Sequence, residues 1–276
     1  MKIGVFDSGY GGLTILQAIR KVLPQYDYIY LGDNARAPYG THSFEVIYRY
    51  TLQAVRYLFD QGCTLVILAC NTASAEALRT IQQCDLPTIN NASRKVNVLG
   101  VIRPTVEAVP TITQTGHVGI LATPATVSSE SYVLELAKIS EAIQVAQQAC
   151  PLWVPIIEAG EHESQGADFF VDKYLQSLLS RDPKIDTLVL GCTHYPLLLP
   201  KIEQWLKQDK QVRVIAQGSL VADSLADYLK RHPEYRDQLS QNGTCTYLTT
   251  EDAGRFSESA SLFLDAPVQA QQICLN

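Results

Sequence analysis

The stretch Thr64–Ser74, TLVILACNTAS, carries an apolar run that stops at a cysteine, an asparagine and a threonine. A second stretch, Thr187–Pro196 with the sequence TLVLGCTHYP, has a similar apolar run that also ends at a cysteine. Short apolar runs bounded by polar residues are typical of buried strands. The sequence therefore predicts that the chain builds one kind of strand and corner twice.

Strand-like runs alternate with helical segments along most of the chain. Helical spacing of apolar residues marks Ser43–Asp60 and Thr72–Gln82, and each follows a strand-like run. This alternation is typical of parallel sheets covered by helices, so we predict an α/β fold. The strand-like runs are Ile3–Phe6, Tyr28–Leu31, Leu65–Leu68, Val98–Ile102, Val118–Leu121, Leu188–Leu190 and Val212–Ile215.

Internal repetition predicts two such sheets. Lys2–Thr14, KIGVFDSGYGGLT, and His117–Ser129, HVGILATPATVSS, each join an apolar strand containing glycine to a small polar turn and a helix start. We expect two doubly wound parallel-sheet domains, pseudo-symmetric and facing across a cleft. The first domain is discontinuous, with residues 1–98 and 212–276, and the second spans residues 99–211. The polar loop Asn90–Asn97 could lie between the two halves.

The cysteine corners should meet in the cleft. In open parallel sheets, ligands bind beyond the carboxyl ends of the strands. Cys70 and Cys192 each follow such an end, one in each half of the chain. We therefore expect the two thiols on opposite walls of one cleft.

Composition disfavours several classes of protein. A chain of 276 residues, 46% of them hydrophobic and 18% charged, can bury a large core, and its length suggests about two domains. The net charge of −6 comes from 28 acidic and 22 basic residues, which disfavours binding to nucleic-acid backbones. No apolar run approaches the roughly 18 residues of a membrane span, and the N-terminal run is too short for a signal peptide. We expect a cytoplasmic protein that binds neither nucleic acid nor membrane.

The seven cysteines are scattered and include no CxxC pair. This pattern argues against a disulfide framework or a zinc site and suits a reducing compartment. Besides the two corner thiols, we expect the cysteines to be small buried side chains. They are Cys63, Cys84, Cys150, Cys245 and Cys274.

The two corner thiols suggest proton transfer. Cys70 directly precedes a predicted helix, whose start Asn71 and Thr72 can cap. A free thiol has a pKa of about 8.5, and a helix N-terminus or a nearby cation can lower it enough for acid and base chemistry. Two thiols across a cleft would supply a base on one face of a carbon and an acid on the other. Inversion of a carbon stereocentre requires this arrangement, and reversal of the reaction exchanges the two roles.

Five motifs, in order along the chain, together resemble the glutamate racemase family, a group of cofactor-independent enzymes of peptidoglycan precursor supply. The resemblance implies an isomerase that interconverts L- and D-glutamate by two-thiol proton transfer. It also implies that the enzyme needs no metal, pyridoxal phosphate or nucleotide and forms a homodimer. The motifs are FDSGYGGLT, LGDNARAPYG, ILACNTAS, VPIIEAGE and VLGCTHYPLL, and the later TYLTTEDAGRF resembles the family's C-terminal segment.

The resemblance also implies roles for individual residues. Cys70 would remove the α-proton from D-glutamate, and Cys192 would act on L-glutamate. Asp7, Glu158 and His194 would be auxiliary catalytic groups that adjust thiol protonation or hold the substrate ammonium. The implied substrate contacts are Asp7, Ser8, Tyr39, Gly40, Asn71, Thr72, Thr193 and His194, and Thr123 and Thr126 are further candidate ligands.

The residues by themselves leave other functions open. The glycines of DSGYGG and the segment Pro38–Gly40 could mark only turns, and His194 and Glu158 could be structural. An aspartate racemase of the same superfamily would differ by one methylene in the pocket, which is worth only about 1–3 kcal/mol. A Cys-His hydrolase would need Cys192 and His194 and would leave Cys70 unexplained. A non-catalytic amino-acid-binding module would need neither thiol.

The chain departs from the family pattern near the junction of its halves. Extra residues follow Thr88, and Arg103 and Thr105 stand where most members carry an acidic residue and a glycine. These differences bear on the connection between the halves and on the dimer contact. The chain also begins at Met1 directly before its first strand, so we expect no activation by a peptidoglycan precursor.

Overall fold

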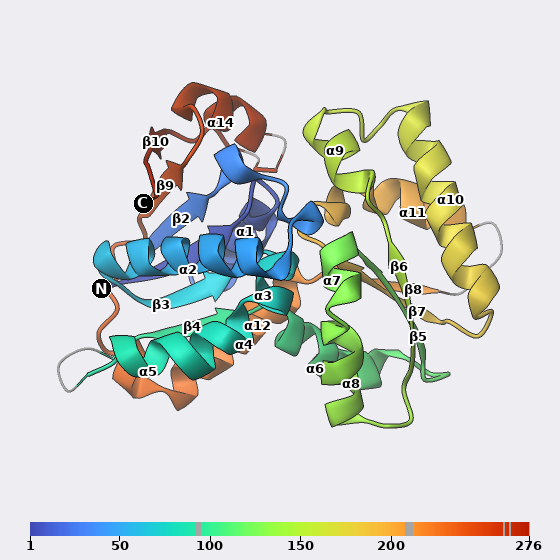
Figure 1. Cartoon of the computed structure of the whole chain (residues 1–276), viewed down its shortest axis with the longest axis horizontal. Coiled ribbons are helices and arrows are strands. Elements are labelled where there is room, and N and C mark those ends of the chain that lie inside the picture. Colours follow the sequence, from blue (N-terminus) through green and yellow to red (C-terminus); the bar gives the residue numbers. More distant parts are fainter. Residues whose placement is uncertain (92–94, 208–211, 262, 265, 276) are drawn as a thin grey trace.

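Two parallel sheets lie side by side in the computed structural model of the chain, which describes residues 1–91, 95–207, 212–261, 263–264 and 266–275 (Figure 1). The first sheet has the strand order β10-β9-β2-β1-β3-β4, and all its neighbouring strands are parallel. Its strands are β1 (Lys2–Asp7), β2 (Tyr28–Gly32), β3 (Cys63–Leu68), β4 (Asn97–Gly100), β9 (Cys245–Thr249) and β10 (Ala270–Gln272).

The second sheet repeats the central part of the first. Its order is β6-β5-β7-β8, again all parallel, and this matches β2-β1-β3-β4 strand for strand. The predicted α/β class with two parallel sheets is therefore confirmed, and β3 and β7, which lead to the cysteine corners, hold equivalent places. The strands are β5 (His117–Ala122), β6 (Gln144–Ala149), β7 (Thr187–Gly191) and β8 (Arg213–Ile215).

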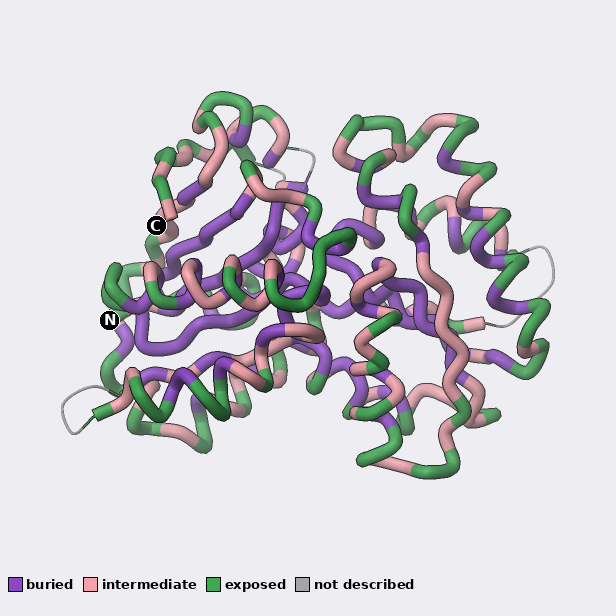
Figure 2. Tube along the Cα trace, viewed as in Figure 1, coloured by how far each residue is buried: buried purple, intermediate pink, exposed green. Residues whose placement is uncertain are grey.

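Helices cover both faces of the first sheet because alternate strand residues point to opposite faces. In β3, Leu65 and Ile67 pack in a core shared with α1 (Gly12–Val22) and α12 (Gly218–Arg231). Val66 and Leu68 point the other way, into a core shared with α2 (Phe44–Asp60). Figure 2 shows the result as buried central strands beneath helices with exposed outer faces.

The second sheet is covered in the same way. Val118 and Val189 pack with the buried residues of α6 and α8, while Leu121 and Leu188 join a core that includes Trp153 of α9. The α-helices are α1 (Gly12–Val22), α2 (Phe44–Asp60), α3 (Asn71–Glu76), α4 (Leu78–Thr80), α5 (Leu86–Ile89), α6 (Ile102–Ile112), α7 (Pro124–Ser128), α8 (Ser131–Ile139), α9 (Trp153–Glu158), α10 (Gln165–Arg181), α11 (Leu199–Leu206), α12 (Gly218–Arg231), α13 (Pro233–Arg236) and α14 (Ala253–Ala260). The 3-10 turns are η1 (Asn34–Arg36), η2 (Tyr39–Thr41) and η4 (Tyr195–Leu198), and η3 (Ile81–Asp85) is a π-helical turn.

Helix α2 shows how the local sequence sets these elements. Its buried residues Ile47, Thr51, Ala54 and Leu58 recur every three or four positions, so they form one face against the sheet. The helix ends just before Gly62, whose φ of +87° places it in the left-handed region that commonly follows a helix. The predicted helix Ser43–Asp60 is therefore confirmed except for Ser43, which occupies the N-cap position.

Strand pairing corrects the predicted domain boundaries. β4 continues to Gly100 in the first sheet, so residues 99 and 100 do not belong to the second half. β8 pairs with β7 in the second sheet, so the chain does not return to the first domain at residue 212 as predicted. The chain returns at α12, which packs against α1. We propose residues 1–100 and 216–276 as the first domain and residues 101–215 as the second.

The predicted polar loop and two predicted elements also need correction. Asn90 follows α5 and Asn97 begins β4, so the described part of Asn90–Asn97 lies within the first half and not between the halves. Residues 92–94 lie outside the described residues. The predicted strand Val98–Ile102 is too long because Ile102 already begins α6. The predicted helix Thr72–Gln82 is divided among α3, α4 and the π-helical turn.

Three strands of the structure, β6, β9 and β10, were not predicted from the sequence. β6 has the sequence QVAQQA and β10 the sequence AQQ, so neither carries the apolar run on which the strand predictions depend. Of the cysteines expected to be buried, Cys63 and Cys150 are buried, but Cys84 and Cys274 are exposed and Cys245 is half-buried.

No helix within the described part of the chain is long and apolar enough to cross a membrane.

Candidate functional site

The predicted thiols meet in one small cavity between the two sheets. Cys70 follows β3 after one residue, and Cys192 directly follows β7, so both lie at carboxyl ends of equivalent strands. The cavity has a volume of about 60 Å³, and both thiols line it. The other lining residues are Ser8, Ala37, Pro38, Tyr39, Gly40, Thr41, Asn71, Thr72, Thr123, Pro124, Cys150, Pro151, Val154, Pro155, Glu158, Thr193 and His194.

Cys70 occupies the N-cap of α3. Its Sγ accepts the backbone N–H of Ala73 at 3.5 Å and lies 3.3 Å from the hydroxyl oxygen of Ser8. Burial and the nearby carboxyl of Asp7 raise the pKa of the Cys70 thiol to about 12, although the hydrogen bonds from Ser8 and Ala73 act in the opposite direction. With its pKa raised in this way, the thiol of Cys70 is protonated near neutral pH.

Cys192 has a different environment. Its Sγ lies 3.9 Å from Nδ1 of His194, and Nε2 of the same ring lies 3.0 Å from Oε1 of Glu158. Burial alone would lower the pKa of His194, but the hydrogen bonds to Cys192 and Glu158 outweigh it and raise the pKa to about 10. A protonated His194 can donate a hydrogen bond to a Cys192 thiolate and to Glu158 at once.

Asp7 lies beneath the cavity and does not line it. One carboxylate oxygen accepts the N–H of Gly9 at 3.0 Å, and the other accepts the hydroxyl of Thr193 at 3.3 Å. Burial raises the pKa of Asp7, while His194 and these hydrogen bonds lower it by less. Asp7 therefore ties the loop after β1 to the corner after β7.

Gly11 of the DSGYGG loop allows the loop after β1 to pack closely against Thr193 and His194. A Cβ on Gly11 would lie 2.3 Å from Oγ1 of Thr193 and 2.5 Å from Nδ1 of His194. Such distances require neighbouring atoms to move. The loop is thus more than a turn, because its backbone packs directly against the residues that follow Cys192.

Hydroxyl groups from both halves meet on another part of the lining. Oγ1 of Thr72 lies 3.0 Å from Oγ1 of Thr123, whose hydroxyl donates to Thr126 at 3.0 Å. A Cβ on Gly40 would lie 2.7 Å from Cβ of Thr123, so the turn at Gly40 is pressed against the same group. Thr123 lines the cavity, whereas Thr126 is fully buried behind it.

Two expected contact residues are held by protein groups. The hydroxyl of Tyr39 donates a short hydrogen bond to Asp33. The side chain of Asn71 bonds to Gln217 and Tyr132, both buried. Sequence reasoning missed Gln217 and Tyr132 because neither lies in a recognisable motif.

The lining contains hydroxyls, thiols and one carboxylate, but no Arg or Lys among its described residues. Among all the residues that the structure describes, no group of three His, Cys, Asp or Glu side chains is arranged to hold a metal ion. A ligand with carboxylate groups would therefore meet backbone N–H groups, hydroxyls and His194.

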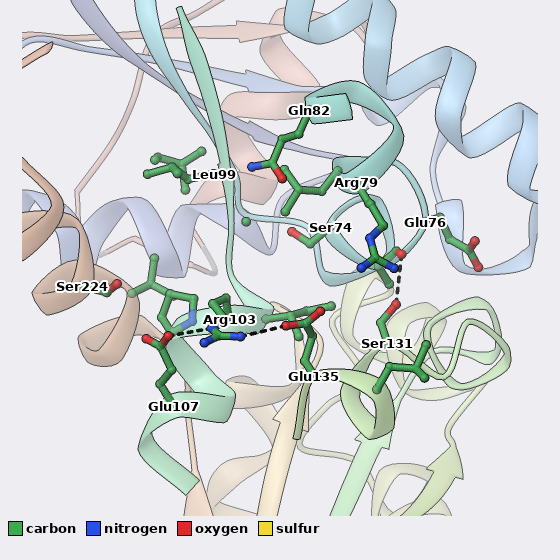
Figure 3. A pocket seen from close by; sticks show the side chains of 18 of the residues that line it. Ser74, Glu76, Arg79, Gln82, Leu99, Arg103, Glu107, Ser131, Glu135 and Ser224 are labelled. Carbon is green, nitrogen blue, oxygen red and sulfur yellow. Dashed lines mark hydrogen bonds and ion pairs between the residues drawn. The ribbon is translucent and has the colours of Figure 1, made fainter. Parts of the chain in front are cut away.

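A second cavity, of about 730 Å³, shares no lining residue with the first. Figure 3 shows Arg103 between Glu107 and Glu135, to which it donates at 2.6 Å and 3.2 Å. The hydroxyl of Ser131 reaches across from the second half to the carbonyl of Ala75 at 3.0 Å. None of the predicted site residues lines this cavity.

Comparison with known proteins identifies relatives over nearly the full chain. Residues 13–225 match the family described as Asp/Glu/Hydantoin racemase. The chain is 43% identical to a glutamate racemase of Ruegeria sp. (strain TM1040), and the match covers 96% of this chain and 97% of that protein. Glutamate racemase isoform RacE1 from Bacillus anthracis has a TM-score of 0.88 at 31% identity, covering 99% of this chain and 97% of the other. The glutamate racemase from Francisella tularensis in complex with D-glutamate has a TM-score of 0.86 at 33% identity, covering 100% and 98%.

Proposed function

Since this chain belongs to the Asp/Glu/Hydantoin racemase family, we propose that it is a glutamate racemase that interconverts L- and D-glutamate. The observation that carries the proposal is that Cys70 and Cys192, from equivalent strands of two sheets, line one cavity. A non-catalytic binding module would have no use for this pair. The D-glutamate formed would supply peptidoglycan synthesis.

We propose that the two thiols exchange protons with opposite faces of the α-carbon. With L-glutamate, the Cys192 thiolate takes the α-proton, and the electron pair left on the carbon is delocalised into the α-carboxylate. The Cys70 thiol then donates its proton to the other face, which gives D-glutamate, a Cys192 thiol and a Cys70 thiolate. With D-glutamate the same steps run in reverse.

The unequal surroundings of the thiols support this assignment. Burial and Asp7 raise the pKa of Cys70, so the free enzyme holds that thiol protonated. His194, whose pKa is raised to about 10, lies beside Cys192 and can stabilise its thiolate. We propose that the resting enzyme is thereby prepared for L-glutamate.

Three auxiliary residues have distinct proposed roles. Glu158 holds His194 protonated through the contact between Oε1 and Nε2. Asp7 positions Thr193 and opposes ionisation of Cys70, since its carboxyl raises the pKa of that thiol. Asp7 does not line the cavity, so we do not propose that it touches substrate.

We propose that the substrate carboxylates are bound by hydroxyls and backbone N–H groups. Ser8, Thr72, Thr123 and Thr193 supply hydroxyls to the lining, and the segment Tyr39–Thr41 supplies backbone. Neutral donors can hold a carboxylate without fixing it as firmly as an Arg would. Such binding leaves the α-carbon placed between the two thiols.

The Cys192–His194 contact also fits a Cys-His hydrolase, which would form an acyl-enzyme at Cys192. This alternative gives no role to Cys70, its Ser8 partner or its place in the same cavity. Circular dichroism separates the functions: the protein should interconvert the enantiomers of glutamate and act much more slowly on those of aspartate. Faster turnover of aspartate would indicate an aspartate racemase, and a trapped acyl-enzyme without racemisation would indicate the hydrolase.

We further propose a cytoplasmic homodimer, as the family resemblance implies. Light scattering coupled to size-exclusion chromatography tests the oligomeric state. A mass equal to that of one 30.5 kDa chain would contradict the dimer.

A further inference from the structure

A buried ring of hydrogen bonds holds the residue that follows Cys70. Nδ2 of Asn71 donates to Oε1 of Gln217 at 2.6 Å, and Nε2 of Gln217 donates to the hydroxyl of Tyr132 at 2.9 Å. The Tyr132 hydroxyl closes the ring by donating to Oδ1 of Asn71 at 2.7 Å. All three residues are buried, and each one both donates and accepts, so the ring is satisfied without water.

Two segments link the sheets: the first runs from β4 to α6, and the second runs from β8 to α12. Gln217 lies on the second segment and contacts the first. It stands between β8 of the second sheet and α12, which packs on the first half. Its Nε2 also donates to Oγ1 of Thr105 at 2.8 Å, and Thr105 lies on α6, just after β4. The Thr105 hydroxyl is fixed in turn because it donates to the carbonyl of Val101 at 2.8 Å.

Helix α3 is tied to the first linking segment as well. The hydroxyl of Ser74 donates to the carbonyl of Leu68 at 2.8 Å and accepts the N–H of Val101 at 3.3 Å. Asn71 and Ser74 therefore fix the first turn of α3 from two sides. The thiol of Cys70 caps that same turn, so its direction depends on how the turn is held.

We propose that Gln217 is a positioning residue, which holds Asn71 and thereby aims the thiol of Cys70 at the substrate. The proposal rests on the racemase function proposed above. Gln217 does not line the cavity that contains the thiols. It would act through geometry, because proton transfer at carbon requires the reacting atoms within a narrow range of distance and angle.

The test compares two variants that each remove side-chain hydrogen bonds near the linking segments. Gln217→Met keeps the length of the side chain and removes its three hydrogen bonds. We expect kcat to fall roughly 10- to 100-fold in both directions, with KM changed much less. No ring member is charged near neutral pH, so the limbs of the pH–rate profile should keep their positions. Asn97→Leu is the control, since Asn97 donates to the hydroxyl of Tyr228 at 2.8 Å and joins β4 to α12 instead of to α3. It should lower the melting temperature and keep kcat.

Native kcat in Gln217→Met, or an equal loss of kcat in Asn97→Leu, would overturn the positioning role. If Gln217→Met does not fold, Thr105→Val and Thr105→Ser decide the question. Valine removes the oxygen to which Gln217 donates and should lower kcat several-fold, whereas serine keeps it and should restore kcat. Equal kcat in these two variants would also overturn the proposal. Absence of glutamate racemisation by the unaltered protein would instead refute the proposed function.

Discussion

His194→Asn tests the proton chemistry at the corner that follows Cys192. The variant removes an imidazole whose Nδ1 lies 3.9 Å from the Cys192 thiol and whose Nε2 lies 3.0 Å from Glu158. Hydrogen bonds to charged groups contribute about 1.5–3 kcal/mol. Since about 1.4 kcal/mol corresponds to a factor of ten in rate, kcat should fall roughly 10- to 150-fold.

The loss should appear mainly in kcat, because removing His194 destabilises the Cys192 thiolate, which is a reactant in one direction and a product of proton transfer in the other. It should also differ between the L-to-D and D-to-L directions, since His194 serves only one of the two thiols. The ratio of kcat/KM in the two directions must nevertheless stay fixed by the equilibrium constant. Circular dichroism with each enantiomer gives all four constants.

His117→Asn is a matched control. His117 also pairs with a carboxylate, because its Nδ1 lies 2.7 Å from Asp182, but it does not line the cavity. This variant should keep kcat in both directions. Near-normal turnover in His194→Asn, combined with a lower melting temperature, would show that His194 only packs and would refute its proposed role.

Other changes test neighbouring parts of the site. Glu158→Gln should lower the pKa of His194 from about 10 and shift the alkaline limb of the pH–rate profile to lower pH; an unmoved limb would contradict the ion pair. Gly11→Ala should overpack the site, because the added Cβ would lie 2.3 Å from Oγ1 of Thr193. The free energy of unfolding should fall by about 1–3 kcal/mol, and both kcat and the melting temperature should fall with it. An active variant of native stability would show that the loop can move away. The folded protein raises the pKa of His194 above its unfolded value of about 6.5, so this stabilisation should be complete below pH 6.5 and lost as pH rises through about 10. Urea titrations across that range should show a flatter decline in His194→Asn than in the unaltered protein. Turnover should survive dialysis against a strong chelator and treatment that removes pyridoxal phosphate, and a loss restored by zinc would overturn the proposed metal-free chemistry.

The sequence predicted the features of the fold that depend on local apolar pattern. The runs before Cys70 and Cys192 are buried on both faces of their sheets, so they stand out as continuous hydrophobic segments. Their repetition was enough to predict two similar sheets and a shared cavity. β6 was missed because it is a half-buried edge strand with polar residues, and its QVAQQA sequence has no apolar run.

The contacts around the site were less predictable where they join distant positions. The bond from Asn71 to Gln217 spans 146 positions, and only the folded chain brings those residues together. The place of Asp7 beneath the cavity likewise depends on the packing of the β1 loop against Thr193. Sequence motifs identified which residues gather near the thiols, but not which of them line the cavity and which support it.

Racemisation in D₂O tests the two-thiol mechanism most directly. Each thiol carries a single proton, so the proton removed from substrate stays on one cysteine while the product receives deuterium from the other. Early in the reaction, with either enantiomer of glutamate, the product should therefore carry deuterium at Cα while the remaining substrate keeps protium. Cys70→Ser and Cys192→Ser should each abolish this turnover. Deuterium entering substrate as fast as product, or full turnover by either serine variant, would contradict proton transfer between Cys70 and Cys192.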